Sequence, residues 1–431
     1  MPNMRILIVS RTPWDISNSF GNTFSNLFAG MDNVEIYHIC CKHGATKGSP
    51  AKATFQMTDL SVMHSILKRR GEVGWSVDSQ DNCKDNAAVS KSAEKNRRPF
   101  AFYVRDLIWT LGAWKNDAAF HAFLDEVKPD VLYLPLYSSC YMCDVQQYVV
   151  DALSIPVVGH ISDDLFAVSP ESPLLMRHYA HRVAKKLHRL IDRCSYLEVF
   201  AENMQRQYAE MFHKPVYLIG KGVDIRILPR ILPADGCREK HFIYTGNIGG
   251  ERWRALLLIG KALNGQTVLD IYSATVLTEE MKMEFAQCDA IRFHGAVSAD
   301  EVLEIQRNGD VLVHVEGFSL AAIAATRMSF STKLIDYMMA GKPIFAVGDL
   351  EINSIAVLKK YGLAVVAASV DEIGIRVNEF LSGCVNIEQL GDHVAEYLVN
   401  YRDIRKIQEG MTERLRGLVE YDQGSANQCG L

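Results

Sequence analysis

One short segment in the last quarter of the chain combines a cation and an acid at helical spacing. The segment Ser331-Thr332-Lys333-Leu334-Ile335-Asp336 is followed by Gly341 and Pro343, so it predicts a short helix with serine at its cap. A lysine in the first helical turn opposes the helix dipole, and a bound anion would remove that conflict. Asp336 lies one turn after Thr332, where a carboxylate can accept hydrogen bonds from ribose hydroxyls. The spacing predicts a site for a nucleoside diphosphate, and the alternative is a helix with a purely structural role.

A glycine-rich turn earlier in the chain is a second candidate for phosphate binding. A predicted strand, 241–245, leads into Gly246-Asn247-Ile248-Gly249-Gly250-Glu251-Arg252 and then into a helix. Glycines let the backbone approach a ligand closely, and a helix start offers N–H groups to a phosphate. The spacing matches neither GxGxxG nor GxxxxGK[ST], which disfavours a classical dinucleotide site and a P-loop. We expect Arg252 or Arg254 to contact a diphosphate; the alternative is a tight turn with solvated arginines.

Three titratable residues follow a strand in the first half of the chain. The predicted strand 156–160 ends in His160, and Asp163 and Asp164 come shortly after it. A histidine or carboxylate at the carboxyl end of a strand is a candidate for a general base that deprotonates a hydroxyl group. The alternatives are a capping acid and a buried histidine, and Glu202 is a weaker candidate. Asp163-Asp164 is no DxD motif and no carboxylate cluster indicates a metal site, so the sequence predicts no bound metal.

The first predicted strand, 4–9, leads to another loop that could approach a ligand. Gly21 and Asn22 lie just before a predicted helix at about 22–30. The glycine could bring the backbone near a diphosphate or a reacting group. A plain capped helix start explains the same residues equally well.

These candidates lie at the ends of strands in two alternating series of strands and helices. That alternation predicts an α/β protein with two doubly wound, Rossmann-like domains, each with a mainly parallel sheet. The loop-rich stretch after Lys221-Gly222-Val223-Asp224 predicts a domain boundary. We expect an N-terminal domain at 1–222 with a mobile insertion at 72–99, a C-terminal domain at 223–385, and a helical segment at 386–431 that returns to the N-terminal domain. Open α/β sheets bind ligands beyond the carboxyl ends of their strands, so the two domains should face a cleft.

Composition excludes several classes of protein. The chain has 431 residues, 48% hydrophobic content and a net charge of −5, which describes a folded protein and argues against nucleic acid as a partner. We identify no signal peptide and no apolar stretch long enough to span a bilayer, so we expect a cytoplasmic protein. The basic residues at 68–70 and 91–98 form either a solvated face or a contact with an anionic membrane at the inner face.

The segment around Lys333 resembles a known family. Residues 331–344 are similar to the S-K-L-x-E-Y-x-A-A-G-K-P-V signature of group 1, or family 4-like, glycosyltransferases. Tyr244-Thr245-Gly246-Asn247 resembles the family's first donor-domain loop, and Phe293-His294-Gly295-Ala296-Val297 resembles its base-contacting loop. Val311 to Phe318 resembles the strand leading to its donor site, and Lys221 to Asp224 its hinge. The resemblance covers about 240–350 well and implies the two-domain GT-B fold.

The resemblance also implies roles for individual residues. Asp336 would hold the ribose and Lys333 the donor phosphates, with Gly246 and Arg252 completing a donor site. The remaining donor-site residues implied by the resemblance are Asn247, Val297, Glu316, Ser331 and Thr332. The family's glutamates eight positions apart are absent, because Met328 lies eight positions before Asp336 and Ala324 eight after Glu316. An insertion at Ser319 to Met328 separates the two halves, so the stereochemical outcome stays open.

Together these features predict a metal-independent glycosyltransferase. It would move a sugar from a nucleotide-diphosphate sugar of the UDP or GDP type, a co-substrate, to a glycan or lipid-linked glycan. It would need no cofactor. The alternatives are a non-hydrolysing sugar-nucleotide epimerase and an inactive GT-B scaffold that binds a partner.

Overall fold

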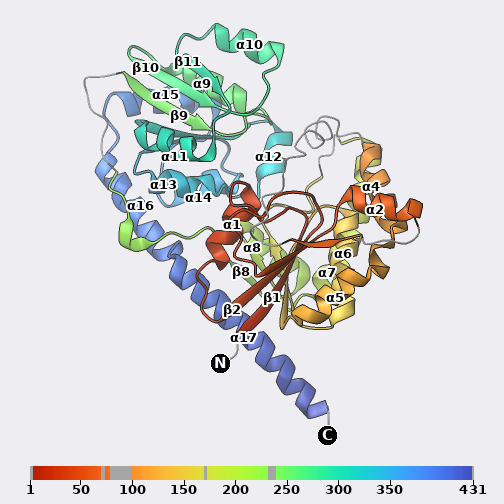
Figure 1. The fold of residues 1–431 in the computed structure, drawn as a ribbon. Coiled ribbons are helices and arrows are strands. Elements are labelled where there is room, and N and C mark those ends of the chain that lie inside the picture. The colour runs from red at the N-terminus through yellow and green to blue at the C-terminus, as the bar shows by residue number, and fades with distance from the viewer. Residues whose placement is uncertain (1–2, 69–72, 78–98, 169–171, 232–238, 430–431) are drawn as a thin grey trace. The chain divides into compact units, whose positions relative to one another are not determined.

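The computed structural model describes residues 3–68, 73–77, 99–168, 172–231 and 239–429 (Figure 1). By its internal contacts the chain divides into two compact units. The first unit comprises Met1–Ile219 and Lys406–Leu431, and the second comprises Gly220–Arg405. The second unit therefore includes residues 386–405, which the sequence analysis grouped with the C-terminal tail. Most of the insertion expected at 72–99 lies outside the described residues.

The first unit is built on an eight-stranded sheet in the order β4-β3-β2-β1-β5-β6-β7-β8. All neighbours are parallel except β3 and β4, which are antiparallel. The chain order reverses between β1 and β5, so the carboxyl ends of these two strands mark the switch point of the sheet. The strands are β1 (Met4–Ser10), β2 (Val34–Cys40), β3 (Ala53–Gln56), β4 (Trp75–Val77), β5 (Val131–Pro135), β6 (Val157–Ile161), β7 (Tyr196–Val199) and β8 (Val216–Leu218).

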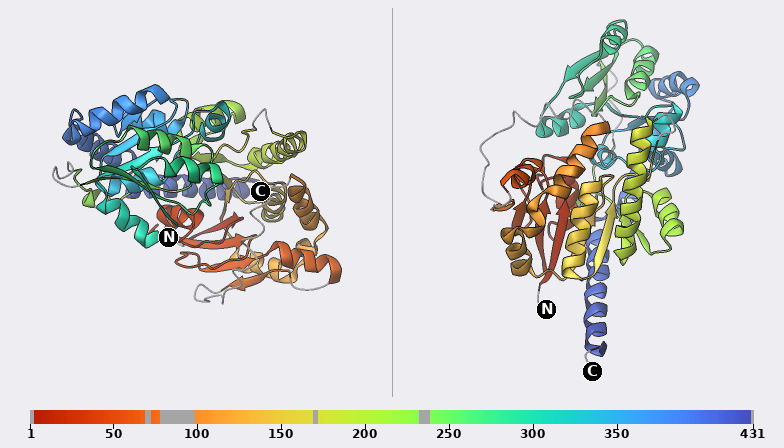
Figure 2. Two further views of the ribbon diagram at one scale, coloured as in Figure 1. Left: turned by 90° about the horizontal axis from the view of Figure 1, so that it is seen from above. Right: turned by 90° about the vertical axis from the view of Figure 1, so that its right-hand side faces the viewer.

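Helices from both ends of the chain complete the core of this unit. The last helix, α17 (Ile404–Cys429), carries the C-terminus (blue in Figure 2). Its Met411 and Leu415 are fully buried against α1 (Ser19–Phe28) and strands β1, β5, β6 and β7. The other helices are α2 (Asp59–Lys68), α4 (Pro99–Leu111), η1 (Ala113–Asn116), α5 (Ala118–Val127), α6 (Cys140–Leu153), α7 (Leu174–Arg193) and α8 (Glu202–Phe212).

The amphipathic pattern over 101–127 predicts a single helix, but this prediction is wrong, because the chain breaks twice in this region. α4 ends at Leu111, and a side chain at Gly112 would lie 2.3 Å from Val62 Cγ1, so the chain turns there against α2. Asp117 then accepts a hydrogen bond from the backbone N–H of Ala119 (3.0 Å) and caps α5. Apolar periodicity alone did not reveal these two local signals.

The second unit is a six-stranded parallel sheet in the order β11-β10-β9-β12-β13-β14. Its chain order reverses between β9 and β12, which places the switch point at the carboxyl ends of these strands. The strands are β9 (Lys240–Thr245), β10 (Thr267–Tyr272), β11 (Ile291–Gly295), β12 (Val311–Val315), β13 (Ile344–Val347) and β14 (Val365–Ala367). The helices are η2 (Ile225–Ile227), α9 (Arg252–Ala262), α10 (Glu279–Ala286), α11 (Ala299–Asn308), α12 (Leu320–Thr326), α13 (Lys333–Met339), α14 (Asn353–Lys360), α15 (Val370–Leu381) and α16 (Ile387–Tyr401).

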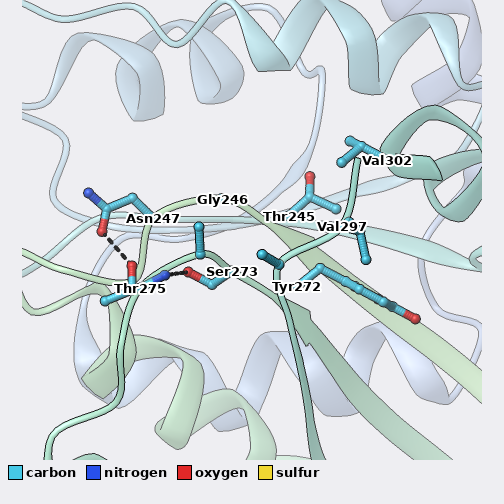
Figure 3. A pocket seen from close by; sticks show the side chains of 10 residues that line it. Thr245, Gly246, Asn247, Tyr272, Ser273, Thr275, Val297 and Val302 are labelled. Carbon is cyan, nitrogen blue, oxygen red and sulfur yellow. Dashed lines mark hydrogen bonds between the residues drawn. The ribbon is translucent and has the colours of Figure 1, made fainter. Parts of the chain in front are cut away.

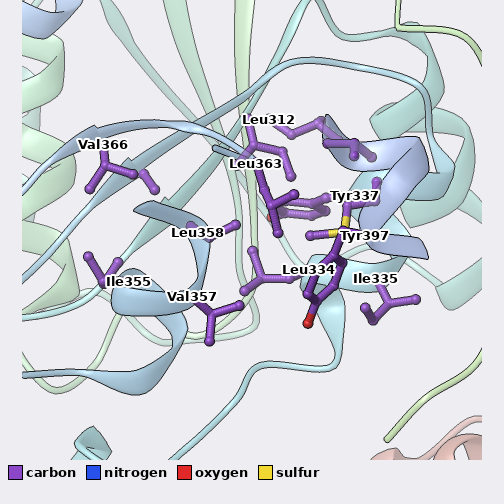
Figure 4. Close-up of a cluster of buried hydrophobic side chains, with 14 of the residues drawn as sticks. Leu312, Leu334, Ile335, Tyr337, Ile355, Val357, Leu358, Leu363, Val366 and Tyr397 are labelled. Carbon is purple, nitrogen blue, oxygen red and sulfur yellow. The ribbon is translucent and has the colours of Figure 1, made fainter. Parts of the chain in front are cut away.

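Both faces of this second sheet are buried, which explains its uninterrupted apolar strands. Ile243 of β9 belongs to one hydrophobic cluster, while its neighbours Phe242 and Tyr244 belong to another. The first cluster contains Leu334 and Ile335 of α13 together with side chains of α14 and α16 (Figure 4). The apolar face of α13 is thus anchored in a core, which fixes the direction of its polar side chains.

The predicted fold class, α/β with doubly wound Rossmann-like domains, is confirmed. Within the described residues, we find no helix with the length and apolar character needed to cross a bilayer.

Candidate functional site

A pocket of about 430 Å³ opens at the carboxyl end of the second sheet (Figure 3). Three loops form it, those that follow β9, β10 and β11. Asn247 and Thr275 are joined across it by a hydrogen bond of 3.1 Å from Thr275 Oγ1 to Asn247 Oδ1. The lining residues are Thr245, Gly246, Asn247, Tyr272, Ser273, Ala274, Thr275, Ala296, Val297 and Val302. The structure therefore brings Gly246, Asn247 and Val297, all predicted from the sequence, into one pocket.

Tyr272, which lines the pocket, stacks on a histidine ring. The rings of Tyr272 and His294 lie 4.5 Å apart at an angle of 10°. His294 Nε2 lies 2.6 Å from Asp270 Oδ1, and the other oxygen of this buried carboxylate lies 2.7 Å from His241 Nδ1. His294, itself held by Asp270, therefore fixes the orientation of the Tyr272 ring. The ring presents a flat apolar surface beside the pocket.

A lysine amine lies directly beside the glycine at the rim of this pocket. Lys333 Nζ donates a hydrogen bond to the carbonyl oxygen of Thr245 (2.9 Å) and lies over the ring of Tyr244, 5.5 Å from its centroid. Gly246 has φ +142°, and a Cβ atom there would lie 2.2 Å from Lys333 Nζ. The backbone conformation therefore favours glycine here, and the amine occupies the space that a side chain would fill.

The surroundings of Lys333 destabilise the charged form of its amine. Burial, and next the nearby Arg252 guanidinium, lower the pKa of Lys333 to about 8, while the carboxylates of Glu316 and Asp336 act in the opposite direction. An anion bound next to the amine would restore its ordinary preference for the charged form. Such a lowered pKa at the rim of a pocket is typical of a functional site.

Arg252 and Glu316 form the second charged pair of the site. Arg252 Nε and Nη2 lie 2.9 Å and 2.8 Å from the same oxygen, Glu316 Oε2. Burial raises the pKa of Glu316, although the neighbouring Arg252 opposes this shift. Arg254, the other predicted arginine, points elsewhere: it lies over the ring of Trp253 and 3.4 Å from Glu280. Arg252 is therefore the arginine that belongs to the site.

Asp336 also has a charged partner, which the sequence did not predict. Lys221 Nζ donates to Asp336 Oδ1, and the two side chains are 13% and 31% exposed. The predicted helix is present as α13, which starts at Lys333, and Ser331 and Thr332 lie half-buried in the turn before it. The site thus holds three cations, Lys221, Arg252 and Lys333, and two carboxylates, so the cations outnumber the carboxylates by one.

In the first unit, His160 is buried in a chain of hydrogen bonds. Tyr133 donates to Glu198 (2.7 Å), so its oxygen accepts from His160 Nδ1 (3.1 Å), and His160 Nε2 accepts from Ser162 (3.0 Å). Burial lowers the pKa of His160 to about 3, and the residue is 1% exposed. Both ring nitrogens already have partners, which corresponds to the alternative of a buried histidine and disfavours a role as general base.

The two aspartates after β6 differ in their surroundings. Asp164 Oδ1 accepts hydrogen bonds from the backbone N–H of Phe166 (3.0 Å) and from the hydroxyl of Tyr208 (3.2 Å), and the residue is half-buried. Asp163 is exposed. Of the three predicted bases, Asp163 is therefore the one whose carboxylate is most open to solvent. Glu202 begins α8.

The loop with Gly21 corresponds to the alternative of a capped helix start. The Gly21 N–H donates to the side chain of Asn18 (2.8 Å), which caps α1. A Cβ atom at Gly21 would lie 2.0 Å from the carbonyl oxygen of Asp15, so packing against that backbone explains the glycine. Asn22 is exposed in the first turn of α1, and a role in ligand binding stays a prediction.

Among the described residues, no group of three His, Cys, Asp or Glu side chains is arranged to hold a metal ion.

Comparison with known proteins identifies the fold. The sequence matches no protein-family model and no characterised protein. Sucrose-phosphate synthase from Thermosynechococcus elongatus has a similar structure, with a TM-score of 0.62 at 12% identity over 97% of this chain and 100% of that chain. HepE from Anabaena in complex with UDP-glucose aligns with a TM-score of 0.61 at 12% identity, over 96% of this chain and 100% of that one. The chain has the GT-B fold.

A third GT-B structure supports the same assignment. An α,α-trehalose-phosphate synthase from Burkholderia xenovorans, in complex with glucose-6-phosphate, has a TM-score of 0.60 at 9% identity and covers 96% of this chain and 100% of that chain. These similarities cover both units of the chain, so neither half is an addition to the GT-B fold.

Two parts of the site were not predicted from the sequence. Tyr272 ends β10 and Thr275 follows it in the loop; the apolar run at 267–272 predicts this strand, so inspection of every residue at its end would have found them. Lys221 lies in the predicted hinge motif, but its pairing with Asp336 joins residues 115 positions apart and leaves no local signal.

Proposed function

We propose that this protein transfers a sugar from a nucleotide-diphosphate sugar to a glycan or lipid-linked glycan, without a metal cofactor. The observation that supports this most is the buried amine of Lys333, held between Gly246 and Arg252 at the rim of the pocket. The excess positive charge suits a diphosphate, and the flat ring of Tyr272 suits a nucleotide base. Asp336, one turn along α13, suits the ribose.

In the proposed reaction the bond between the sugar's anomeric carbon and the diphosphate oxygen breaks. The acceptor hydroxyl oxygen forms a new bond to that carbon, and its proton passes to a carboxylate. Lys333 and Arg252 stabilise the negative charge that develops on the leaving diphosphate, which is the role that metal ions have in other transferases. We propose Asp163 as the proton acceptor, because this residue lies at the surface while His160 is buried.

A thermal-shift panel of UDP, GDP and their sugar conjugates tests the proposal. A ligand at 100 times its Kd stabilises the folded state by about 2.7 kcal/mol, so one nucleotide should raise the Tm clearly. Product analysis with and without an acceptor then separates the two enzyme reactions. A nucleotide sugar converted to its epimer without any acceptor would favour the epimerase, and failure of every nucleotide to bind would favour a scaffold.

The lowered pKa of Lys333 predicts how nucleotide affinity depends on pH. Below pH 8 the amine is charged and ready to bind a diphosphate; above it, binding must also take up a proton. Affinity for UDP or GDP should therefore fall as pH rises from 7.5 to 9.5, by up to about tenfold per pH unit. The phosphates are already ionised in this range, because their second pKa is about 6. Calorimetric titration at several pH values measures the effect.

Two variants make this pH test specific. Lys333→Arg keeps a charge at all these pH values and should remove the decline near pH 8. Glu316→Gln removes a carboxylate that raises the pKa of Lys333, so the midpoint should move to lower pH. An unchanged midpoint in both variants would assign the pH dependence to another group.

We also propose a peripheral contact with an anionic membrane. The basic stretches at 69–70 and 91–98 lie outside the described residues, as does the side chain of Lys68. Support comes instead from α4, where Phe100, Val104, Leu107 and Leu111 are exposed at helical spacing, two of them 68% (Phe100) and 57% (Leu107). The guanidinium of Arg182 in α7 lies 5.4 Å from the ring centroid of Tyr103 of α4, which places positive charge beside this helix.

Vesicle sedimentation tests the membrane contact. The protein should sediment with phosphatidylserine-containing vesicles and less with neutral ones. Replacing Phe100 and Leu107 by serine together should weaken binding about tenfold or more, because two exposed apolar side chains are lost. Val276→Ser, at another exposed apolar position (76%), is the control. Equal binding to both vesicle types, or an unaffected double variant, would contradict the proposal.

A further inference from the structure

Lys221, the partner of Asp336, lies in the segment that connects the two units. The first unit ends at Ile219 and the second begins at Gly220, so Lys221 lies where the chain first passes from one unit to the other. Its amine bonds the one carboxylate that the proposed function assigns to the ribose. The contact lies wholly within the second unit.

The chain connects the two units a second time near residue 405, and the segment just before this connection is hydrogen-bonded to segment 220–223. The backbone N–H of Val223 donates to the carbonyl of Arg402 (2.7 Å), and that of Ile404 donates back to Val223 (3.0 Å). Both glycines beside Lys221 lie close to this second segment, and Gly222 packs against its backbone. A Cβ atom at Gly220 would lie 2.0 Å from Arg402 Nη1, and one at Gly222 would lie 2.7 Å from Ile404 Cα. Segments 220–223 and 402–404 are therefore packed together and joined by a single β-bridge between Val223 and Asp403.

The two bridged segments, 220–223 and 402–404, also contact the residues before α13. Arg402 is buried, donates to the hydroxyl of Tyr397 (2.8 Å), and lies over the ring of Phe330, 4.8 Å from its centroid. Phe330 directly precedes Ser331, where the predicted phosphate-binding segment begins. The bridged segments thus make two contacts with this region. Lys221 bonds Asp336 of α13, and Arg402 lies over Phe330, which precedes α13.

We propose that Lys221 is a positioning residue that occupies Asp336 until the ribose of a nucleotide displaces it. A ribose diol donates two hydrogen bonds, and a carboxylate accepts both best when both its oxygens are open. Asp336 Oδ1 is already taken by Lys221. Nucleotide binding then releases Lys221, and with it the restraint on segment 220–223. This inference rests on the proposed function, because it needs a nucleotide at this site.

If Lys221 and the ribose compete for Asp336, the variant Lys221→Met should bind nucleotides more tightly. The methionine keeps the apolar stem but cannot hold Asp336, so UDP or GDP should bind about fivefold tighter, the scale of a partly exposed ion pair. The matching 2′,3′-dideoxynucleotide has no ribose hydroxyls and should bind equally to both proteins. Lys221→Arg should restore the wild-type ratio, and Lys359→Met, at an exposed lysine of the same unit, should change neither affinity.

Three results would overturn this inference. Weaker binding of both nucleotide types to Lys221→Met would mean that Lys221 contacts the phosphates or supports the fold. Unchanged binding of both would mean that the ion pair does not compete. If the variant does not fold, hydrogen exchange on the wild-type protein decides: amides of 220–223 should exchange faster with UDP or GDP than with the dideoxy form, and equal exchange would overturn the inference. Absence of nucleotide binding by the wild-type protein would instead contradict the proposed function itself.

Discussion

Replacing Lys333 by methionine should lower the rate of sugar transfer about 10²- to 10³-fold, the usual cost of losing one group that stabilises developing negative charge. Lys333 Nζ is held by the Thr245 carbonyl beside Gly246. The fold should survive, because methionine fills the same space and removes a buried charge that costs free energy to desolvate. Steady-state kinetics and a melting curve on the same sample separate the two effects.

The matched control for Lys333 is Lys359→Met, which removes an exposed lysine from α14 of the same unit. Its rate and Tm should equal those of the wild-type protein. Transfer by Lys333→Met at close to the wild-type rate would remove the main support for the proposed donor site.

Replacing Asp336 by alanine should weaken binding of UDP or GDP about 10- to 100-fold, because hydrogen bonds to a charged group contribute about 1.5–3 kcal/mol. The loss should be absent for the 2′,3′-dideoxynucleotide, which offers no hydroxyls to this carboxylate. The transfer rate should fall as well, because the ribose is no longer held in register with Lys333. Calorimetric titration with both nucleotides measures the difference.

Removal of Asp336 leaves the amine of Lys221 without its partner, so a second change completes the experiment. The double variant Asp336→Ala, Lys221→Met should lose ribose discrimination to the same extent as Asp336→Ala alone. Asp392→Asn, at an exposed acid of α16, is the control for charge. An equal loss for ribose and dideoxyribose nucleotides would show that Asp336 acts on something other than the ribose.

The sequence was sufficient to predict the doubly wound architecture, because both sheets consist mainly of buried parallel strands that produce continuous apolar runs. The sequence predicts no strand at β3, β4 or β8, because these segments have only three or four residues and carry no clear period. All six strands of the second unit coincide with apolar runs in the sequence, whereas α12 lies in the segment that the sequence indicates as an insertion.

The candidate site could be predicted only where its members are close in sequence. Lys333 and Asp336 lie on one short helix, and Gly246 and Arg252 on one loop, so local spacing was informative. The pairing of Arg252 with Glu316 and of Lys221 with Asp336 depends on the order of strands in the sheet, which a single sequence does not determine. His160 shows the opposite limit: its place at a strand end was predicted, but not the aromatic rings of Phe24 and Phe200 that bury it.

Helix α17 has a consequence for the order in which the chain folds during synthesis. Gln408 donates to the carbonyls of Asn26, Leu27 and Ala29, more than 370 residues earlier, and Arg414 pairs with the buried Glu198. Until the ribosome has released these last residues, the first sheet lacks Met411 and Leu415 from its core, and Glu198 lacks its cation. The unit that is translated first can therefore complete its native structure only after the second unit has been made.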